Sequence, residues 1–468
     1  MLFSSISFLY YFLPLVILIY YIAPSRFKNL VLLASSLIFY GWGEPKFVIV
    51  MIIAIIAGYI FGRLIEFYQD TKLAKVFLIL SIITSLGELF YFKYVDFFIG
   101  NFNNIFNTSI PLLRVALPIG VSFYLFQIMS YTIDVYRKQV VSQRNIISFG
   151  AYVSSFPQLI AGPIVRYSDI EKQLNKREHS FDKCAVGIER FVIGLSKKVL
   201  IANALGELCN IFVASNDKSV LFFWLYAISF TLHIYFDFSG YSDMAIGLGK
   251  IFGFDFIENF NYPYISKTVT DFWRRWHMSL GSWFRDYVYI PLGGNRVNKL
   301  RWLFNILCVW FLTGFWHGAS WNFIIWGLYF ALFLIIEKLF IKKYLDKSKF
   351  LAHIYLLLII IIGFVIFNAI NMQDAFYYIQ SMFGLSDVSL ISNEFIYYLR
   401  SYGFTIIVAT VLSTPLLKNI YFKLINSSNK TIVIMMKVLT LVCLVILLLS
   451  STAYLVDGSF NPFLYFRF

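Results

Sequence analysis

The chain has 468 residues, of which 59% are hydrophobic and 14% are charged, and its mean hydropathy is +0.73. Soluble domains average about 25% charged residues, so this composition excludes an ordinary globular enzyme and indicates a polytopic membrane protein. The net charge of +14 would suggest nucleic acid in a soluble protein. Here the basic residues lie in short loops between apolar runs, which is typical of the excess of Lys and Arg in cytoplasmic loops and of contact with anionic membrane lipids. No nucleic-acid-binding pattern is present.

A spanning helix needs about 20 apolar residues, and the apolar runs predict an all-α protein. We expect a single transmembrane domain over 1–468, with about 11 spans plus re-entrant segments and a catalytic core over about 115–340. The first run, Ile6 to Ile22, lacks a preceding basic region and a cleavage site, which favours a retained helix over a signal peptide. The four cysteines form no Cys-x-x-Cys pair, so we expect buried free thiols.

Lysine and arginine set the orientation of the first half of the chain. The apolar runs are Ile6 to Ile22, Leu30 to Tyr40, Phe47 to Gly62, Val76 to Phe92 and Val115 to Val135. Basic residues follow alternate runs, so we place these residues inside: Arg26 and Lys28; Arg63, Lys72 and Lys75; Arg137, Lys138 and Arg144.

Two later segments are apolar but interrupted. Ile146 to Val165 is broken by Pro157 and by Gly162-Pro163, which predicts a re-entrant segment because broken backbone is tolerated only where protein or water covers it. The charged stretch 166–183 predicts a solvated surface helix. Cys184 to Val213 contains Lys197-Lys198, a pair too costly for a lipid-facing midplane, and we expect an irregular segment there.

The remaining spans lie on either side of a central stretch, Asp271 to Trp326. They are Leu221 to Phe236, which leads into Asp237 to Asp243, and then Phe323 to Phe340, Ile354 to Ile370, Phe404 to Leu416 and Ile432 to Leu455. No internal repeat and no soluble domain is visible. Ionisable groups at membrane depth usually line a cavity or pathway, so the histidines and arginines of the central stretch predict a reaction site.

The first half of that stretch begins with a helix start. Thr268 and Asp271 resemble a capping box, and the helix that follows would carry Trp273, Trp276 and His277, with Trp273 and His277 on one face. Arginine suits phosphate or carboxylate ligands, but anchoring to lipid headgroups explains a cluster equally well. The arginines concerned are Arg274, Arg275 and Arg285.

His317 follows the apolar run Trp302 to Trp316 and has small neighbours. Pro291 to Arg296 is a tight turn and lacks the spacing of a phosphate loop. Gly314 and Gly318 would permit close approach of backbone or ligand. An imidazole with a pKa near 6.5 can take a proton from a hydroxyl, so His317 is either a general base or a buried structural histidine. His233 and Asp237 are four apart and could pair, although packing is the simpler interpretation.

Familiar hydrolase and metal motifs are absent. The chain has no Gly-x-Ser-x-Gly elbow, no His-Glu-x-x-His motif and no cysteine cluster. We therefore expect no bound metal or cofactor.

Several motifs resemble the membrane-bound O-acyltransferase family, in particular its alginate O-acetyltransferase-like branch. They are Phe272 to His277, Trp283 to Arg296, Trp316 to Gly318, Pro157 to Ile164, Asp237 to Asp243 and the tail Asn461 to Phe468. The resemblance covers nearly the whole chain. The teichoic acid D-alanyltransferases are similar at Trp-His but differ after the Phe-Arg-Asp segment.

The resemblance implies a ring of helices around a central funnel or tunnel, with His317 as the catalytic histidine and His277 as the second family position. It implies a cytoplasmic thioester donor, acetyl-CoA or an acyl carrier, and a hydroxyl acceptor on an exported or cell-envelope polysaccharide, reached directly or through an extracytoplasmic acetyltransferase partner. The expected location is the inner or plasma membrane. Residues expected to bind substrate or donor are Trp273, Arg274, Arg275, Trp276, Arg285 and Trp316.

Three alternatives stay open. D-alanyl transfer to teichoic acid would use a related site. A transporter for a small acyl compound would use the histidines for proton relay, but such proteins often show paired repeats and none is found here. A structural scaffold would gain nothing from polar residues at membrane depth.

Overall fold

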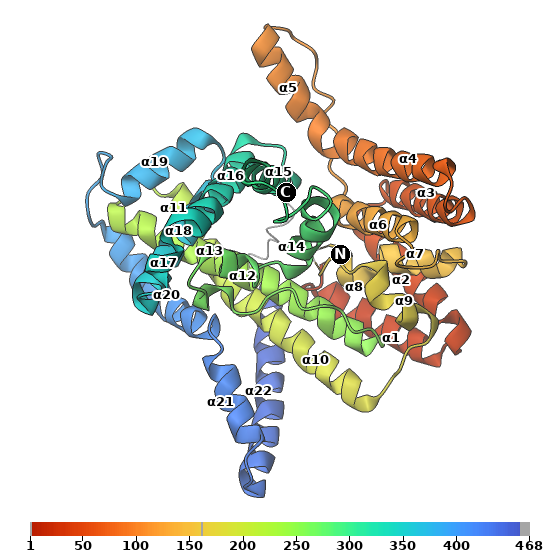
Figure 1. Cartoon of the computed structure of the whole chain (residues 1–468). Coiled ribbons are helices and arrows are strands. Elements are labelled where there is room, and N and C mark those ends of the chain that lie inside the picture. The colour runs from red at the N-terminus through yellow and green to blue at the C-terminus, as the bar shows by residue number, and fades with distance from the viewer. Residues whose placement is uncertain (1, 161, 459–468) are drawn as a thin grey trace. The chain divides into compact units, whose positions relative to one another are not determined.

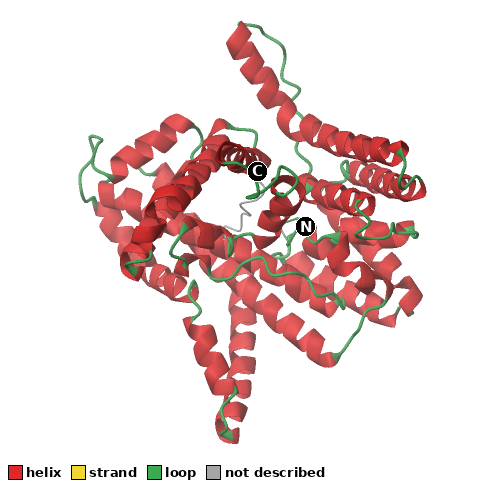
Figure 2. Ribbon diagram, viewed as in Figure 1, coloured by secondary structure: helices red, strands yellow, loops and turns green. Residues whose placement is uncertain are grey.

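The computed structural model describes residues 2–160 and 162–458, and within them the secondary structure is helical with no strand (Figure 2). The tail motif Asn461 to Phe468 lies outside the described residues. Among these described residues seven helices are long and apolar enough to cross a membrane, and Phe8–Ile22 is a shorter apolar helix. The predicted all-α membrane class is confirmed, whereas the number of about 11 spans and the central tunnel stay predictions.

The chain divides into two compact units. Unit 1 is Met1–Phe191 with Ser242–Glu258, and unit 2 is Val192–Tyr241 with Asn259–Phe468. The earlier expectation of a single domain with a core over 115–340 stays a prediction.

Unit 1 contains the amino-terminal helices (Figure 1). Their bounds are η1 Phe8–Phe12, α1 Leu13–Ile22, η2 Ser25–Phe27, α2 Lys28–Gly43, α3 Val48–Phe67, α4 Lys72–Leu89, η3 Phe90–Tyr94, α5 Val95–Phe106, α6 Val121–Tyr136, α7 Ile146–Ser154, α8 Phe156–Leu159 and α9 Tyr167–Asn175. The predicted first helix is present. The predicted break near Pro157 is also confirmed, because α7 ends at Ser154 and the short α8 begins at Phe156, with both helices buried in protein.

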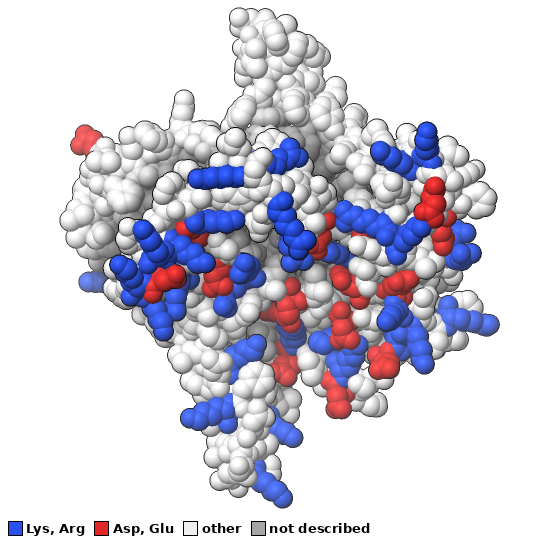
Figure 3. All heavy atoms as spheres, viewed as in Figure 1, with Lys and Arg blue, Asp and Glu red and all other residues white. Residues whose placement is uncertain are grey.

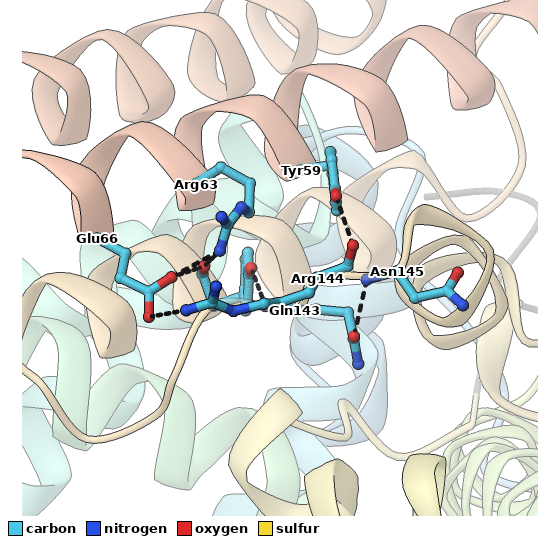
Figure 4. Close-up of polar contacts among 8 residues, drawn as sticks. Tyr59, Arg63, Glu66, Gln143, Arg144 and Asn145 are labelled. Carbon is cyan, nitrogen blue, oxygen red and sulfur yellow. Dashed lines mark hydrogen bonds and ion pairs between the residues drawn. The ribbon is translucent and has the colours of Figure 1, made fainter.

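A polar cluster joins the end of α3 to the loop before α7 (Figure 4). Arg63 Nη1 lies 2.8 Å from Glu66 Oε2, and Arg144 Nη2 lies 3.5 Å from Glu66 Oε1. Tyr59 donates a hydrogen bond of 2.8 Å to the carbonyl oxygen of Arg144. Arg63 and Arg144, both expected at the inner side, therefore lie on the same side of unit 1.

Helices α10 and α12 begin in one unit and end in the other. α10 spans Phe181–Ser196 and continues through the π-helical turn η4, Lys197–Ala202, into α11, Asn203–Ala214. This irregular turn begins at the lysine pair, as predicted. α12 spans Val220–Ile251, so the helix expected to stop near Phe236 continues through the Asp237 to Asp243 motif.

Unit 2 holds the central stretch and the carboxy-terminal helices. Their bounds are η5 Pro263–Ile265, α13 Val269–Trp273, α14 Met278–Phe284, η6 Arg285–Tyr289, α15 Lys299–His317, α16 Trp321–Ile336, η7 Glu337–Ile341, α17 Lys342–Leu345, α18 Lys349–Asn368, α19 Met372–Met382, α20 Asn393–Leu412, α21 Leu416–Ile425 and α22 Lys430–Val456. Its core is rich in aromatic side chains from α12, α13, α16 and α18. Burying such large rings is the main apolar contribution to stability.

The α21–α22 hairpin carries only positive charge. Residues 416–456 contain four lysines and no acidic residue, and the hairpin shows blue but no red spheres in Figure 3. Only 6% of the most apolar 18-residue stretch of α22 is buried inside the protein. This combination favours lipid contact along α22, with the lysines at the headgroup level.

Candidate active site

His317 is the last residue of α15 and is buried, with 6% of its surface exposed. Three aromatic rings surround its imidazole. The ring centroids of Trp316, Trp326 and Phe367 lie 4.9, 5.0 and 5.3 Å away, and all three planes are steeply inclined to it. These aromatic walls limit the rotation of the imidazole and place it in an apolar setting.

Helices α15 and α16 approach closely and hold His317 at their junction (Figure 1). A Cβ atom on Gly314 would lie 2.3 Å from the carbonyl oxygen of Phe323, and one on Gly327 would lie 2.2 Å from that of Trp310. Any side chain at either position would force the helices apart. The predicted close approach at the small residues near His317 is therefore confirmed.

His277 does not lie on the helix predicted for it. Thr268 caps α13 as expected, since its side chain accepts a hydrogen bond from the backbone N–H of Asp271, but the helix ends at Trp273. His277 instead precedes α14 with φ +44°, in the left-handed region. The prediction that Trp273 and His277 share a helix face is therefore wrong, because three residues outside α13 separate its end from His277.

Asn259 fixes the proton position on His277. Its Oδ1 accepts from the backbone N–H of Ser279 at 3.2 Å, so this atom is an acceptor, and His277 Nδ1 at 3.1 Å must donate to it. The Nε2 atom then carries the lone pair, and it is buried without a hydrogen-bond partner in the described part of the chain. Burial also lowers the pKa of His277, which favours the neutral imidazole.

Trp316 brings the two histidines into one site. Its ring centroid lies 6.0 Å from that of His277 and 4.9 Å from that of His317. On its other side His277 contacts Phe238 of α12, with centroids 4.6 Å apart. The structure thus unites His277, His317 and Trp316, three of the residues that the sequence analysis selected.

The other two predicted tryptophans belong to aromatic packing. Trp273 contacts Trp310, Trp326 and Phe330, with centroids 4.8, 5.6 and 4.8 Å away. Through Trp326 this cluster reaches His317. Trp276 stacks on Phe272 at 5.5 Å and contacts other core rings. Both support the walls of the site, and their predicted role in binding substrate is untested.

The three predicted arginines lie nearer to solvent than the histidines. Arg274 is exposed. Arg275 Nε lies 3.0 Å from Asp271 Oδ1, and Arg285 Nε lies 2.6 Å from Asp286 Oδ1. Two of them are therefore paired with nearby carboxylates, and their predicted contact with donor phosphates is untested.

Sequence reasoning missed Glu337, which holds the start of α13. This buried carboxylate in η7 accepts from the backbone N–H groups of Val269 at 2.5 Å and Thr270 at 3.2 Å. A carboxylate at a helix N-terminus satisfies unpaired N–H groups and complements the helix dipole. The signal for it was an acidic residue inside an otherwise apolar run.

Asn259 and Trp326 were missed as well. Trp326 packs against His317, and its indole Nε1–H is buried without a hydrogen-bond partner among the described residues. Within those residues no group of three or more His, Cys, Asp or Glu side chains could hold a metal ion. The four cysteines are free, but the prediction that they are buried holds only for Cys209, and Cys443 is exposed. The site is thus built from imidazoles, an amide and indole rings.

The model of the family "MBOAT, membrane-bound O-acyltransferase family" matches residues 135–380, which include both histidines. The chain belongs to the membrane-bound O-acyltransferase family. It is an O-acyltransferase and a multi-pass membrane protein, as the sequence analysis predicted.

The names of relatives within the family refer to different polymers. "Probable alginate O-acetylase AlgI" of Azotobacter vinelandii is 42% identical over 396 residues, covering 83% of this chain and 79% of the relative. "Peptidoglycan O-acetyltransferase" of Helicobacter pylori is 33% identical over 514 aligned residues, covering 100% and 98%. "Teichoic acid D-alanyltransferase" of Bacillus subtilis is 32% identical over 247 residues, covering 50% and 62%. The predicted likeness to the alginate-acetylating branch is confirmed.

Proposed function

We propose that this O-acyltransferase moves an acetyl group from a cytoplasmic thioester, acetyl-CoA, to a hydroxyl of an exported or cell-envelope polysaccharide. The relatives that match over more than three quarters of their length are named for O-acetylation, which supports acetyl over D-alanyl transfer. The observation that carries the proposal is the pair of buried histidines that both contact Trp316. The location we propose is the cytoplasmic membrane.

His317 acts as the general base in this proposal. It takes the proton of the acceptor hydroxyl while that oxygen attacks the thioester carbonyl carbon. The tetrahedral intermediate then collapses and the carbon–sulfur bond breaks. The thiolate leaves and takes the proton from the imidazolium, so the products are an ester and a thiol and His317 returns to its starting state.

In this proposal His277 orients a substrate group that donates a hydrogen bond to it. Its Nδ1–H is engaged by Asn259 Oδ1, so the neutral ring offers only the lone pair of Nε2. A lone pair accepts a hydrogen bond and cannot stabilise a developing oxyanion. The proposal therefore favours orientation of a substrate hydroxyl or amide N–H by His277 over stabilisation of developing charge.

The acyl group reaches the polymer directly or through an extracytoplasmic partner protein. A hydroxyl-bearing polymer made or exported at the membrane fits the alginate and peptidoglycan relatives. In the second route a hydroxyl of the partner attacks the thioester, and the partner then passes the acyl group from its ester to the polymer.

The test is acetyl transfer by purified protein carrying His317→Gln. With acetyl-CoA and a soluble polysaccharide acceptor, ester formation should fall by about 10²–10⁴-fold, the usual contribution of a general base. The matched control is His353→Gln, because His353 bonds to the carbonyl oxygen of Ser266 and should leave the rate unchanged. Undiminished ester formation in the folded His317 variant would refute the proposal, and a wild-type protein that moves acetyl-CoA without cleaving it would indicate a transporter.

A further inference from the structure

A group of basic side chains lies near the carboxyl end of α1 within unit 1, whereas both histidines of the candidate active site belong to unit 2. Lys28 Nζ lies 4.8 Å from the ring centroid of Tyr20 and 5.3 Å from that of Tyr21. His179 Nε2 lies 3.0 Å from the hydroxyl of Tyr20, which donates to the carbonyl oxygen of Phe252 at 2.7 Å. These contacts fix the positions of the basic groups before any ligand binds.

Arg177 completes the group and is only partly satisfied. Its guanidinium lies 4.6 Å from the ring centroid of Phe254, and its Nη2 donates to Asn29 Oδ1. Its Nη1 is buried and has no hydrogen-bond partner in the described residues. A buried charged donor without a partner costs free energy, so an acceptor is missing at this position.

No carboxylate neutralises Lys28 or Arg177 in residues 2–160 and 162–458. Burial lowers the pKa of His179, and the charges of Lys28, Arg177 and Lys183 lower it further. Asp255, which follows Phe254, is paired with Lys183 at 2.7 Å and with Lys250 at 3.0 Å. The group therefore holds positive charge that the protein does not balance.

Gly253 packs closely against this basic group. Gly253 adopts φ +86°, and a Cβ atom there would lie 3.1 Å from His179 Nε2 and 3.2 Å from the Cβ of Arg177. The residue beside the basic groups is thus one without a side chain. Arginine and lysine together are suited to phosphate, through directed N–H donors and a point charge respectively.

We propose that Lys28, Arg177 and His179 form a binding site for a phosphate group at the inner membrane surface. The phosphate belongs either to the headgroup of an anionic phospholipid or to a soluble phosphate-bearing compound. Lys28 follows the amino-terminal apolar helix by six residues, which places the site at the expected headgroup level. The site does not depend on acyl transfer.

The test measures binding to full-length protein in a neutral detergent. The probes are short-chain phosphatidylglycerol, short-chain phosphatidylcholine and adenosine bisphosphate, and the variants are Lys28→Gln and Arg177→Gln. Phosphatidylglycerol should bind saturably, and each variant should weaken it about tenfold, the factor equivalent to ~1.4 kcal/mol. Arg26→Gln is the matched control, because it removes an exposed charge two residues from Lys28 that contacts only Phe27 among the printed contacts.

The outcomes separate the two sources of phosphate. Competition by adenosine bisphosphate supports the site with a soluble ligand, and binding of phosphatidylglycerol alone supports it with a lipid headgroup. An equal loss in Arg26→Gln would show diffuse attraction to a positive surface and overturn the proposal, as would unchanged binding in Lys28→Gln. Lys28→Gln keeps the contacts of Arg177 with Asn29 and Phe254, so its result holds even where Arg177→Gln fails to fold.

Discussion

The ion pair between Lys198 of η4 and Asp237 of α12 gives a sharp test of how the site is supported. Lys198 Nζ lies 2.6 Å from Asp237 Oδ1, and both side chains are 1% exposed. Changing Asp237 to Leu leaves an ammonium buried without this countercharge. Removing one member of a buried pair typically costs about 3–5 kcal/mol, whereas replacing both with apolar residues is often neutral or stabilising.

The prediction therefore concerns coupling between the two positions. We expect Asp237→Leu and Lys198→Met each to lower the thermal unfolding midpoint strongly, and the double variant to recover most of the loss. The measurement is intrinsic tryptophan fluorescence of the purified protein in detergent, at a single heating rate because unfolding of such proteins is often irreversible. Lys423→Met is the control, since Lys423 is exposed and surface changes usually stay within about ±0.5 kcal/mol.

A double variant as unstable as the sum of the two single variants would refute this reasoning. Additive losses would mean that the two charges do not compensate each other and that each is stabilised by other groups.

One turn before Asp237 on α12, His233 Nδ1 lies 2.7 Å from the carbonyl oxygen of Ala202. His233 and Asp237 thus both contact η4, and the possible pairing of these two residues with each other stays a prediction.

Three further predictions concern the histidine site. Asn259→Ala removes the oxygen that holds the proton on His277 Nδ1, so kcat should fall about tenfold or more while the unfolding midpoint is nearly retained. An unchanged rate would contradict the proposed tautomer. Trp326→Phe keeps one aromatic ring but removes the indole N–H and the five-membered ring, and we expect kcat to fall by about 10²-fold if this N–H donates to the oxyanion, whereas an unchanged kcat would assign Trp326 to packing alone. Gly314→Ala should destabilise the protein by roughly 1–3 kcal/mol through overpacking and reduce folded yield, whereas Gly403→Ala, which meets no atom within 4 Å, should not.

Much of the fold follows from local patterns that the sequence displays. Apolar runs predict α3, α4, α16, α18 and α22 because spanning length and hydropathy depend on adjacent residues only. The lysine pair at Lys197-Lys198 predicts the irregular η4, since a charged side chain at membrane depth must be kept away from lipid or paired. The carboxylate that pairs with Lys198 belongs to Asp237 of α12. It can be identified only when it is known which helix packs beside η4.

The same distinction separates the predicted and missed parts of the site. His277, His317 and Trp316 carry chemistry that is recognisable in the residue types. Asn259 and Glu337 act on residues 18 and 68 positions away, by holding His277 and the start of α13. Such pairs have no signature in either local segment. Their roles become visible only when the backbone has placed an acceptor beside a donor.

The failure at His277 has a physical cause that bears on function. Helical spacing predicts that Trp273 and His277 share a face, but the chain leaves the helix and adopts φ +44° at His277. A non-glycine residue in this region is uncommon and carries a conformational cost. That cost is balanced here by the contacts of Asn259 with His277 and Ser279, and by the backbone pairing of Met278 N–H with the Asn259 carbonyl at 3.0 Å. A helical backbone at this point would not give His277 this conformation, so the departure from the local pattern is what places its Nδ1 against Asn259 and its ring against Trp316.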